Sequence, residues 1–383
     1  MTETADVVVV GGGAVGTSAA YHLAAAGAGR VVLLERADAF GTGSTGACAG
    51  GFRQQFSSRI NIELSRASVP MILGFSDLHG LPLDLAQDGY LFLLRDDDDW
   101  AGFRASADLQ RSMGVDARLL TADEAADVAP GIAIDDVVGA TFCPDDGIAD
   151  PSGLTQGYAT AARRAGAELR LGVEASAIES DGERVTGILT SEGVIEARAI
   201  VNAAGPWAAG LAATVGITLP LEPIPRMVVT TGPFPGAPVR RTLVIDAATS
   251  YYFHKEGDGV LMGMGGREER PSFDLSVDHR LIEEELLPTA VRVFPPIERA
   301  GIANTWAGLY EMTPDRHPII GEAPIRGLFL ANGFSGHGFQ HAPIVGKLVA
   351  ELIVEGAART VDISSLGLDR FERGELVMEG HVV

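Results

Sequence analysis

The first 36 residues predict an α/β fold that begins with a Rossmann-like dinucleotide-binding unit. Val7–Val10 is uniformly apolar, as expected for a strand of a parallel sheet that is covered on both faces. A glycine-rich turn and a helix rich in small residues follow, and a second strand, Val31–Leu34, ends at Glu35. A strand, a crossover helix and a second strand in this order predict a parallel sheet at the start of the chain.

The turn of this unit carries a nucleotide-binding fingerprint. Gly11, Gly13 and Gly16 form G-x-G-x-x-G between the strand and the helix. The first glycine allows the tight turn, the second lets the backbone approach a pyrophosphate, and the third lets the helix pack on the strand. The helix N-terminus offers N–H groups to phosphates, and Glu35 can accept hydrogen bonds from ribose hydroxyls. The unit therefore predicts a bound dinucleotide.

Several later stretches predict further elements of the same fold. A helix is expected to begin at Asp150–Pro151, because aspartate is a good N-cap and proline fits the first helical position. Residues 198–216 repeat the pattern of strand, glycine turn and helix. Residues 250–265 predict a hairpin with its turn at Gly257–Gly259, and residues 327–334 predict a last strand.

Composition and charge exclude several classes of function. The 383 residues include 29 basic and 51 acidic side chains, a formal net charge of −22, so neither nucleic acid nor an anionic membrane is an expected partner. No apolar run is long enough to span a membrane, and the N-terminus lacks the features of a signal peptide. Two cysteines, Cys48 and Cys143, fit a reducing compartment, so a cytoplasmic location is expected. The acidic run Asp96–Asp99 predicts a solvated loop.

The stretch from Ala331 to Ile353 combines a glycine-rich turn, two histidines and an apolar helix. By itself it allows a metal site, a phosphate loop, a catalytic histidine pair or only a turn. His337 and His341 are four residues apart, but no acidic or cysteine ligand is near them in the sequence, which disfavours a metal site. A phosphate loop is also disfavoured, because the pyrophosphate already has its own glycine turn.

Five stretches, taken in order, resemble the D-amino-acid oxidase/sarcosine oxidase-like family of FAD-dependent oxidoreductases. They are DVVVVGGGAVGTSAAYHLAAAG, GSTGACAGGFRQQFS, VNAAGPWA, YEMTPDRHPIIG and NGFSGHGFQHAPIVG, and together they extend over nearly the whole chain. Within the family the motifs are most similar to those of the β subunits of sarcosine oxidase and L-proline dehydrogenase. The resemblance implies a glutathione-reductase-type FAD-binding domain formed by residues 1–85, 145–222 and 305–383. A substrate-binding domain built on a mixed sheet, residues 86–144 and 223–304, is inserted into it.

The resemblance also implies which residues contact FAD. The glycine turn would hold the pyrophosphate, Glu35 the adenosine ribose, and the backbone of Val173 the adenine. Residues 44–53 would pass the reactive edge of the flavin. The turn at residues 333–338 would lie under the ring, and the next helix would direct its partial positive charge at the N1–C2=O edge. The implied contacts are Gly11, Gly13, Ala14, Val15, Gly16, Glu35, Arg36, Ser44, Thr45, Ala49, Gly50, Gly51, Val173, Ala204, Gly205, Trp207, Gly308, Gly333, Phe334, Ser335, Gly336, His337, Gly338, Phe339 and Gln340.

For the substrate, the resemblance points first to Arg53. A carboxylate needs a fixed bidentate cation, and arginine offers that geometry where lysine does not. Tyr251, Tyr252 and His254 would lie on a hairpin that roofs the pocket, with cross-strand packing as the alternative. His337 is a candidate neighbour of the flavin, whereas His341 is expected to be a packed or exposed helix residue.

Two departures from the family concern how FAD is attached. Some relatives bind FAD covalently through a cysteine or a histidine, and the matching positions here are Gly308 and Ala47. Cys48 is adjacent, but a free cysteine is usually a small buried packing residue. Non-covalent FAD is therefore expected.

Two further departures concern lysines. Leu261 stands where oxidases of the family carry a lysine that activates O2, and neither Lys255 nor Lys347 is well placed to replace it. Gln340 stands where monomeric sarcosine oxidases carry a lysine near the flavin pyrimidine, and it can still donate a hydrogen bond there. A dehydrogenase is therefore expected rather than an efficient oxidase.

Together these implications predict an enzyme that oxidises the C–N bond of an amino acid or secondary amine, such as sarcosine or proline, by hydride transfer to flavin N5. The expected acceptor is a carrier protein or quinone, with O2 less favoured. No metal is expected, and both homo- and hetero-oligomeric assemblies stay open. Two alternatives remain: an FAD-dependent 2-hydroxy-acid dehydrogenase on the same fold, and a weakly catalytic flavin-binding assembly subunit.

Overall fold

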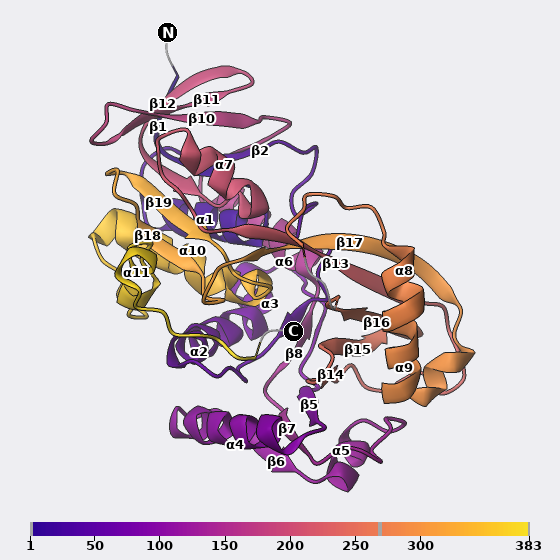
Figure 1. Cartoon of the computed structure of the whole chain (residues 1–383). Helices are drawn as coiled ribbons and strands as arrows, with labels where there is room; N and C mark the ends of the chain where they lie inside the picture. Colours follow the sequence, from indigo (N-terminus) through magenta and orange to yellow (C-terminus); the bar gives the residue numbers. More distant parts are fainter. Residues whose placement is uncertain (1–2, 267–269, 382–383) are drawn as a thin grey trace.

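A mixed sheet with a parallel core forms one half of the structure, a computed structural model that describes residues 3–266 and 270–381 (upper left in Figure 1). Its middle strand, β1 (Glu3–Val10), pairs in parallel with β2 (Val31–Glu35) and with β12 (Gly193–Asn202). The strand, helix and strand expected at the start of the chain are thus confirmed.

Five more strands complete this first sheet. Two of them continue the parallel arrangement, one beside β2 and one beside the end of β12, and three are antiparallel to their neighbours. The two parallel strands are β9 (Glu168–Leu171), which pairs with β2, and β19 (Leu328–Asn332), which pairs with β12. The antiparallel strands are β10 (Ala175–Ser180), β11 (Val185–Thr190) and β18 (Ile319–Glu322).

Both faces of the first sheet are covered, which explains why β1 is uniformly apolar. Val7 and Val9 pack into one hydrophobic cluster, and Val8 and Val10 pack into another on the opposite face. The first cluster lies beneath α1 (Ala14–Ala25), which is flanked by α6 (Pro151–Arg164) and α10 (Gly338–Glu355). Next to α10 lies α2 (Arg59–Leu73), and α7 (Ala208–Ala213) covers part of the second face.

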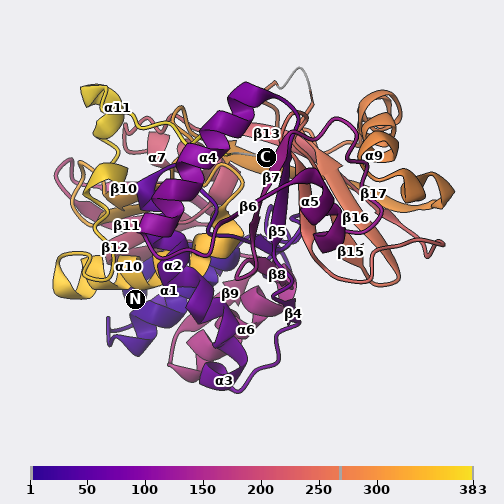
Figure 2. The same cartoon turned by 90° about the horizontal axis from the view of Figure 1, so that it is seen from below.

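A second sheet of eight strands stands beside the first (Figures 1 and 2). One of its faces packs on the helical segments after β16, and the other faces the cavities described below. In order, its strands are β17 (Ile302–Met312), β13 (Glu222–Thr231), β16 (Gly259–Met264), β15 (Tyr251–Glu256), β14 (Leu243–Asp246), β5 (Tyr90–Leu94), β7 (Gly139–Cys143) and β6 (Arg118–Leu120).

Apart from α4, the remaining elements are short. A small third sheet is formed by β3 (Gly51–Phe52), β8 (Gly147–Ala149) and β4 (Leu85–Ala86). The other helices are α3 (Phe75–His79), α4 (Asp97–Ser112), α5 (Ala122–Val128), α8 (His279–Leu281), η2 (Ile282–Leu286), α9 (Leu287–Val293) and α11 (Arg370–Arg373), with single turns at η1 (Gly205–Trp207), η3 (Pro295–Arg299) and η4 (Ser364–Leu366).

The two domains remain a prediction, and strands of the second sheet cross their proposed boundaries. The strands of the second sheet fall mainly in residues 86–144 and 223–304. However, β13 begins at Glu222 and β17 continues to Met312, so the predicted boundary between residues 304 and 305 falls inside a strand. β13 and β17 pair along almost their whole length, and β17 connects the second sheet to the turn before β18.

Local predictions at helix starts and at the hairpin had different outcomes. The side chain of Asp150 accepts a hydrogen bond from Ser152 N at 2.9 Å, with Pro151 in the first turn, as predicted. The hairpin β15–β16 turns between Glu256 and Gly259, also as predicted. The solvated loop predicted for Asp96–Asp99 is wrong, because Asp96 caps α4 and the next three aspartates form its first turn. Acidic side chains at a helix N-terminus are stabilised by the helix dipole, so this charge run starts a helix.

Within residues 3–266 and 270–381, no helix combines the length and apolarity that a membrane span would require.

Candidate active site

A large cavity opens at the carboxyl ends of the parallel strands. Its volume is about 660 Å³, and its lining includes residues within two positions of the ends of β1, β2, β9, β12 and β19. Ligands of open α/β sheets bind at this edge because the strands end there and the loops diverge. Predicted cofactor contacts that line it are Gly11, Gly13, Ala14, Val15, Glu35, Arg36, Ser44, Thr45, Val173, Ala204, Gly205, Trp207, Phe334, Gly336, Gly338 and Phe339.

Each of the three fingerprint glycines is required for a different structural reason. Gly11 has φ +108°, and a Cβ there would lie 2.3 Å from the carbonyl oxygen of Ala203. A Cβ on Gly16 would lie 1.8 Å from the carbonyl oxygen of Gly11, so Gly16 permits the packing of α1 and does not line the cavity. Gly13 is less crowded, with only Thr45 Oγ1 at 3.2 Å from such a Cβ, and it leaves the N-terminus of α1 open to a phosphate.

Glu35 is held at the end of β2 by backbone donors. Its Oε2 accepts a hydrogen bond from Gly12 N at 2.7 Å, and its Oε1 accepts one from Ala37 N at 2.8 Å. A carboxylate has further lone pairs, so it can still accept ribose hydroxyls in this orientation. Beside it, the guanidinium of Arg36 stacks at 3.9 Å on the ring of Trp207, which forms a flat wall of the cavity.

The turn at residues 333–338, which follows β19, borders the same cavity. Gly333 and Ser335 both have positive φ but do not line a cavity, and they shape the turn. Glu311 supports it: Oε1 accepts a hydrogen bond from Phe334 N at 3.3 Å, while the buried Oε2 has no hydrogen-bond partner within the described chain. Burial raises the pKa of Glu311 to about 7. A cavity lined by a glycine cradle, a ribose acceptor, a flat cationic wall and a helix N-terminus fits a dinucleotide.

A second, smaller cavity of about 90 Å³ lies against the first, under the second sheet. The two cavities share lining residues, so a ligand in the large one would border the small one. Shared residues are Ser44, Cys48, Leu309, Tyr310, Gly336 and Phe339. Predicted site residues that line the small cavity are Ala49, Gly50, Gly51, Arg53, Tyr252, Gly308, His337 and Gln340.

Three tyrosines around the small cavity are each seated against a glycine. A Cβ on Gly51 would lie 1.5 Å from the hydroxyl of Tyr90, and one on Gly263 would lie 2.4 Å from that of Tyr252. A Cβ on Gly336 would lie 2.5 Å from the ring of Tyr310. Gly51 and Gly336 therefore make room for aromatic side chains, a reason that the sequence did not reveal.

Arg53 is a buried cation in the wall of the small cavity. It is 4% exposed, and its guanidinium lies 4.0 Å from the centre of the Phe56 ring. Its Nη atoms donate to the carbonyl oxygens of Gln55 and His381, and its backbone N donates to Gln340 Oε1 at 2.7 Å. Among the described residues, no carboxylate forms an ion pair with it, and its Nε–H makes no hydrogen bond. Burial lowers the pKa of Arg53, as expected for a cation away from water.

Two of the three residues expected to roof the pocket, Tyr251 and His254, do not line it. Neighbouring residues of a strand point to opposite faces of a sheet, so Tyr252 lines the cavity while Tyr251 is fully buried in the core of the second sheet. His254 shares the face of Tyr252 but is tied down, with Nε2 3.1 Å from the carbonyl oxygen of Ala49 and Nδ1 2.8 Å from that of Lys255. It supports the loop behind the cavity.

The two histidines of the glycine-rich turn also differ. His337 lines the small cavity, and its Nε2 lies 3.3 Å from Arg53 Nη2. Burial, followed by the charge of Arg53, holds the pKa of His337 well below its usual range, so the ring is neutral. His341 is fully buried in α10, with Nε2 2.9 Å from Ser65 Oγ, and lines neither cavity. It is a packed helix residue.

The positions that bear on FAD attachment line the cavities, whereas those that bear on O2 do not. Gly308 lies against Ala47, where a Cβ would come within 2.8 Å of the alanine Cβ. Cys48 lines both cavities, but burial raises its pKa to about 11, so its sulfur is a thiol and a poor nucleophile. Leu261 is buried in β16, and the chain's two lysines, Lys255 and Lys347, line neither cavity.

Sequence reasoning missed Tyr90, Arg226 and Tyr310. All three line the small cavity, and the guanidinium of Arg226 lies 4.9 Å from the centre of the Tyr310 ring. They come from β5, β13 and β17, which are distant in sequence and meet only because the second sheet assembles. The alternation of β13, where Arg226 and Val228 share a face, is the one sequence signal that could have indicated the arginine.

Comparison with known proteins identifies the family. The family model for FAD-dependent oxidoreductases (DAO) matches residues 6–352. The chain is 32% identical to FAD-dependent oxidoreductase domain-containing protein 1 of Xenopus laevis, over 100% of this chain and 85% of that protein. It is 31% identical to glycine oxidase of Geobacillus kaustophilus, over 97% of this chain and 98% of that protein.

Solved structures agree with this match. The structure of L-proline dehydrogenase from P. horikoshii superimposes with a TM-score of 0.91 at 34% identity, covering 98% of this chain and 100% of that chain. The family model covers both sheets and the turn at residues 333–338, and the large cavity fits the dinucleotide that the family uses. The chain therefore belongs to the DAO family of FAD-dependent oxidoreductases.

Proposed function

We propose that this enzyme oxidises the C–N bond of an amino acid or secondary amine whose carboxylate is held by Arg53. The observation that carries the proposal is the buried guanidinium of Arg53, which lines the small cavity without an acidic partner among the described residues. An ion away from water is costly unless it is paired. A substrate carboxylate would supply the missing charge.

The rest of the small cavity suits the apolar part of such a substrate. Val228, Leu243 and Ile245 contribute aliphatic walls, and Tyr90 and Tyr252 contribute aromatic rings. A proline-like ring or an N-methyl group could pack there while water is excluded. His337 stands beside Arg53 as a neutral ring, so it adds no positive charge that would repel the substrate amine.

The position of the small cavity orients the substrate toward the cofactor. When bound in the large cavity, FAD supplies the hydride acceptor for the α-carbon of the substrate. The protein's own contribution is to fix the carboxylate at Arg53, so that the α-carbon faces the shared wall of the two cavities. The N-terminus of α10 borders both cavities. Its partial positive charge would stabilise the negative charge that the flavin gains on reduction.

We also propose that the enzyme is a dehydrogenase with non-covalently bound FAD. Neither lysine lines either cavity, so no lysine ammonium group is placed to attract O2 there. The thiol of Cys48 is protonated, and Gly308 and Ala47 offer no nucleophile. Acid precipitation should release the flavin into the supernatant, and the reduced enzyme should reoxidise faster with a dye than with O2.

A matched pair of substrates tests the role of Arg53. L-proline and pyrrolidine share the amine and differ in the carboxylate, so kcat/KM should favour L-proline in the wild type. Arg53→Ala should remove about 2–5 kcal/mol of that preference while FAD stays bound, since loss of one partner of a buried charge pair has this magnitude. Arg226→Lys serves as the comparison, because Arg226 also lines the cavity. Loss of the preference in Arg226→Lys but not in Arg53→Ala would assign the carboxylate to Arg226.

A further inference from the structure

The last described segment of the chain returns to the active site. After α11, residues 375–381, here called the closing segment, run past α2 toward the middle of the molecule (Figures 1 and 2). Its first four residues are exposed, whereas Glu379 and His381 are buried. The segment has no regular secondary structure, so its position depends on contacts at its end, where Gly380 N also donates to Ser57 Oγ at 2.7 Å and Glu379 N donates to the carbonyl oxygen of Asp315 at 3.1 Å.

Glu379 anchors the closing segment at the start of α2. Its carboxylate is fully buried and accepts six hydrogen bonds. Ser57 and Ser58 each donate both their N–H and their hydroxyl, at 2.6–3.1 Å, Asn61 Nδ2 donates at 3.1 Å, and His381 N donates at 3.0 Å. Ser58 is the N-cap of α2, a helix of 15 residues. The carboxylate therefore satisfies backbone donors where the helix dipole favours negative charge.

His381 connects this anchor to the active site. Its carbonyl oxygen accepts a hydrogen bond from Arg53 Nη2, and its ring stacks on Phe103 of α4 with centres 3.9 Å apart and planes 11° apart. On the other Nη, Arg53 donates to the carbonyl oxygen of Gln55. Two carbonyls thus fix the two ends of the guanidinium. One of them belongs to a segment more than 300 residues away in the sequence.

We propose that Glu379 is a positioning residue for Arg53. It holds the closing segment so that the His381 carbonyl orients the guanidinium toward a substrate carboxylate. The inference rests on the proposed function, in which Arg53 binds that carboxylate. An arginine side chain has many rotamers, so a fixed orientation lowers the entropy lost when the substrate binds. Loss of the anchor should weaken carboxylate binding without touching the cofactor cavity, since no residue of the closing segment lines it.

The test measures binding of acetate and acetamide to the FAD-loaded protein through the change in flavin absorption. The two probes have similar size, and only acetate carries the charge that Arg53 recognises. In Glu379→Gln the Kd for acetate should rise on the order of tenfold, the scale of one hydrogen bond to a charged group, while the Kd for acetamide should stay within twofold. For a proline-like substrate the same variant should raise KM with little change in kcat.

Controls separate positioning from general loss of structure. Glu375→Gln removes an exposed carboxylate of the same segment that pairs with Arg373 at 3.0 Å, and it should leave both Kd values unchanged. Phe103→Leu removes the ring beneath His381 and keeps the Glu379 anchor, so it should weaken acetate binding in the same direction and by less. Phe103→Leu also supplies the test if Glu379→Gln fails to fold.

Two outcomes would overturn the inference. The first is a Kd for acetate in Glu379→Gln that equals the wild-type value. If Glu379→Gln does not fold, the same result in Phe103→Leu counts instead. The other is equal weakening of acetate and acetamide, which would indicate a general distortion of the cavity. Failure of the wild type itself to bind acetate would instead overturn the proposed function, and the inference with it.

Discussion

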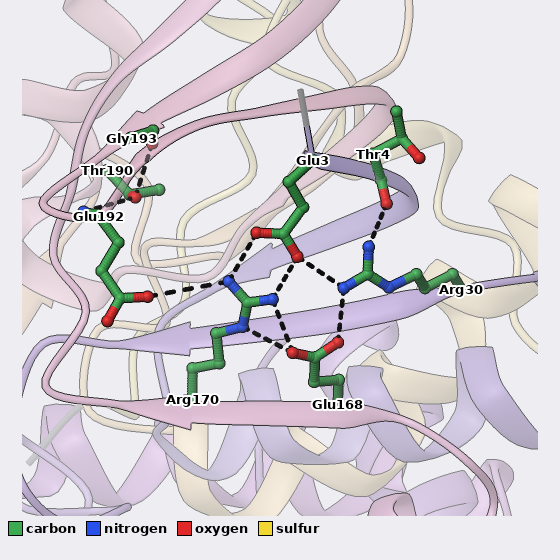
Figure 3. Close-up of polar contacts among 8 residues, drawn as sticks. All are labelled: Glu3, Thr4, Arg30, Glu168, Arg170, Thr190, Glu192 and Gly193. Carbon is green, nitrogen blue, oxygen red and sulfur yellow. Dashed lines mark hydrogen bonds and ion pairs between the residues drawn. The ribbon is translucent and has the colours of Figure 1, made fainter. Parts of the chain in front are cut away.

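The two edges of the central parallel strands have opposite chemistry. At the carboxyl edge, the strands end in glycines and small residues around a cavity of about 660 Å³. Toward the amino edge, Glu3 of β1, Arg30 before β2 and Glu168 at the start of β9 form a compact ion-pair network with Arg170, which lies two residues further along β9, with contacts of 2.6–2.7 Å among them (Figure 3). Glu192 approaches from the β11–β12 turn at 3.9 Å.

The difference shows how one sheet separates function from stability. The amino edge is filled by charges that pair with one another, and its side chains are partly exposed. The carboxyl edge borders the large cavity, which adjoins the small cavity with the buried cation of Arg53, and under the proposed function a cofactor and a substrate would fill the two cavities. Changes at the carboxyl edge should therefore affect binding and chemistry, whereas changes at the amino edge should affect stability alone.

The largest effect is expected for Gly11→Ala. The new Cβ would lie 2.3 Å from the carbonyl oxygen of Ala203, at a φ of +108° that disfavours any side chain. We expect about 2–6 kcal/mol from the combined strain and clash, and a protein that purifies largely without FAD. The ratio of flavin to protein absorbance measures this. Gly27→Ala, at φ +75° with no atom within 4 Å of the new Cβ, is the control and should keep its FAD. An equal loss of FAD in both variants would show that FAD binding does not depend specifically on the absence of a side chain at Gly11.

Next in size is the pH dependence due to Asp146, which supports the loop after Arg53. It is fully buried and accepts hydrogen bonds from Gln54 N at 2.8 Å and Gln55 Nε2 at 3.1 Å. Burial raises its pKa from 3.8 to about 7. The protonated form is the one favoured in the fold, so this contribution is complete below pH 3.8 and is lost as pH rises through about 7. The free energy of unfolding of the wild type should fall by about 2–4 kcal/mol as pH rises across this window, and Asp146→Asn should abolish this fall.

Urea titrations from pH 4 to 7.5 compare the two proteins. Parallel pH profiles for the wild type and Asp146→Asn would contradict the raised pKa.

A smaller effect is expected at the amino edge. Arg170→Met removes the arginine that contacts Glu3, Glu168 and Glu192, all of them partly exposed. We expect a loss of about 1 kcal/mol, because partly exposed ion pairs contribute little and are screened by salt. The Tm should fall by a few degrees at low salt and by less at high salt. FAD content and kcat/KM should not change. A change in either would contradict the claim that the amino edge contributes to stability alone.

The smallest effect concerns Glu3 in acid. Hydrogen bonds from Arg170 and Arg30 lower its pKa to about 2. Its contribution is therefore complete above the unfolded pKa of 4.5 and is lost as pH falls toward 2, the reverse of Asp146. Glu3→Gln should flatten the loss of stability between pH 4.5 and 2 by about 0.5 kcal/mol, the scale of an exposed pair. Identical acid unfolding curves for the two proteins would show that the network does not act through this charge.

Much of the first sheet could be predicted because its signals are local. The apolar run of β1, the glycine turn and the cap at Asp150 each reflect chemistry within a few residues. The charge run Asp96–Asp99 was predicted to be a solvated loop, and the capping hydrogen bond from Asp99 N to the Asp96 side chain shows that it starts a helix instead.

The candidate site was less predictable because it is assembled from distant strands. Tyr251 and Tyr252 are adjacent in sequence, and only the face that the sheet presents to the cavity distinguishes them. Arg226 reaches the cavity through the pairing of β13 with β17. The closing segment has no pattern of its own, and six hydrogen bonds to Glu379 place it beside Arg53.

The most direct test of the central claim is anaerobic reduction of the bound FAD. The purified protein is mixed without O2 with L-proline, sarcosine, other amino acids, the corresponding amines without a carboxylate, and 2-hydroxy acids, while the flavin absorption is followed. We expect bleaching by at least one amine that carries an α-carboxylate and none by its decarboxylated counterpart. Bleaching by 2-hydroxy acids alone, or by no compound of the panel, would contradict the account and would favour a hydroxy-acid dehydrogenase or a flavin-binding subunit with little catalysis.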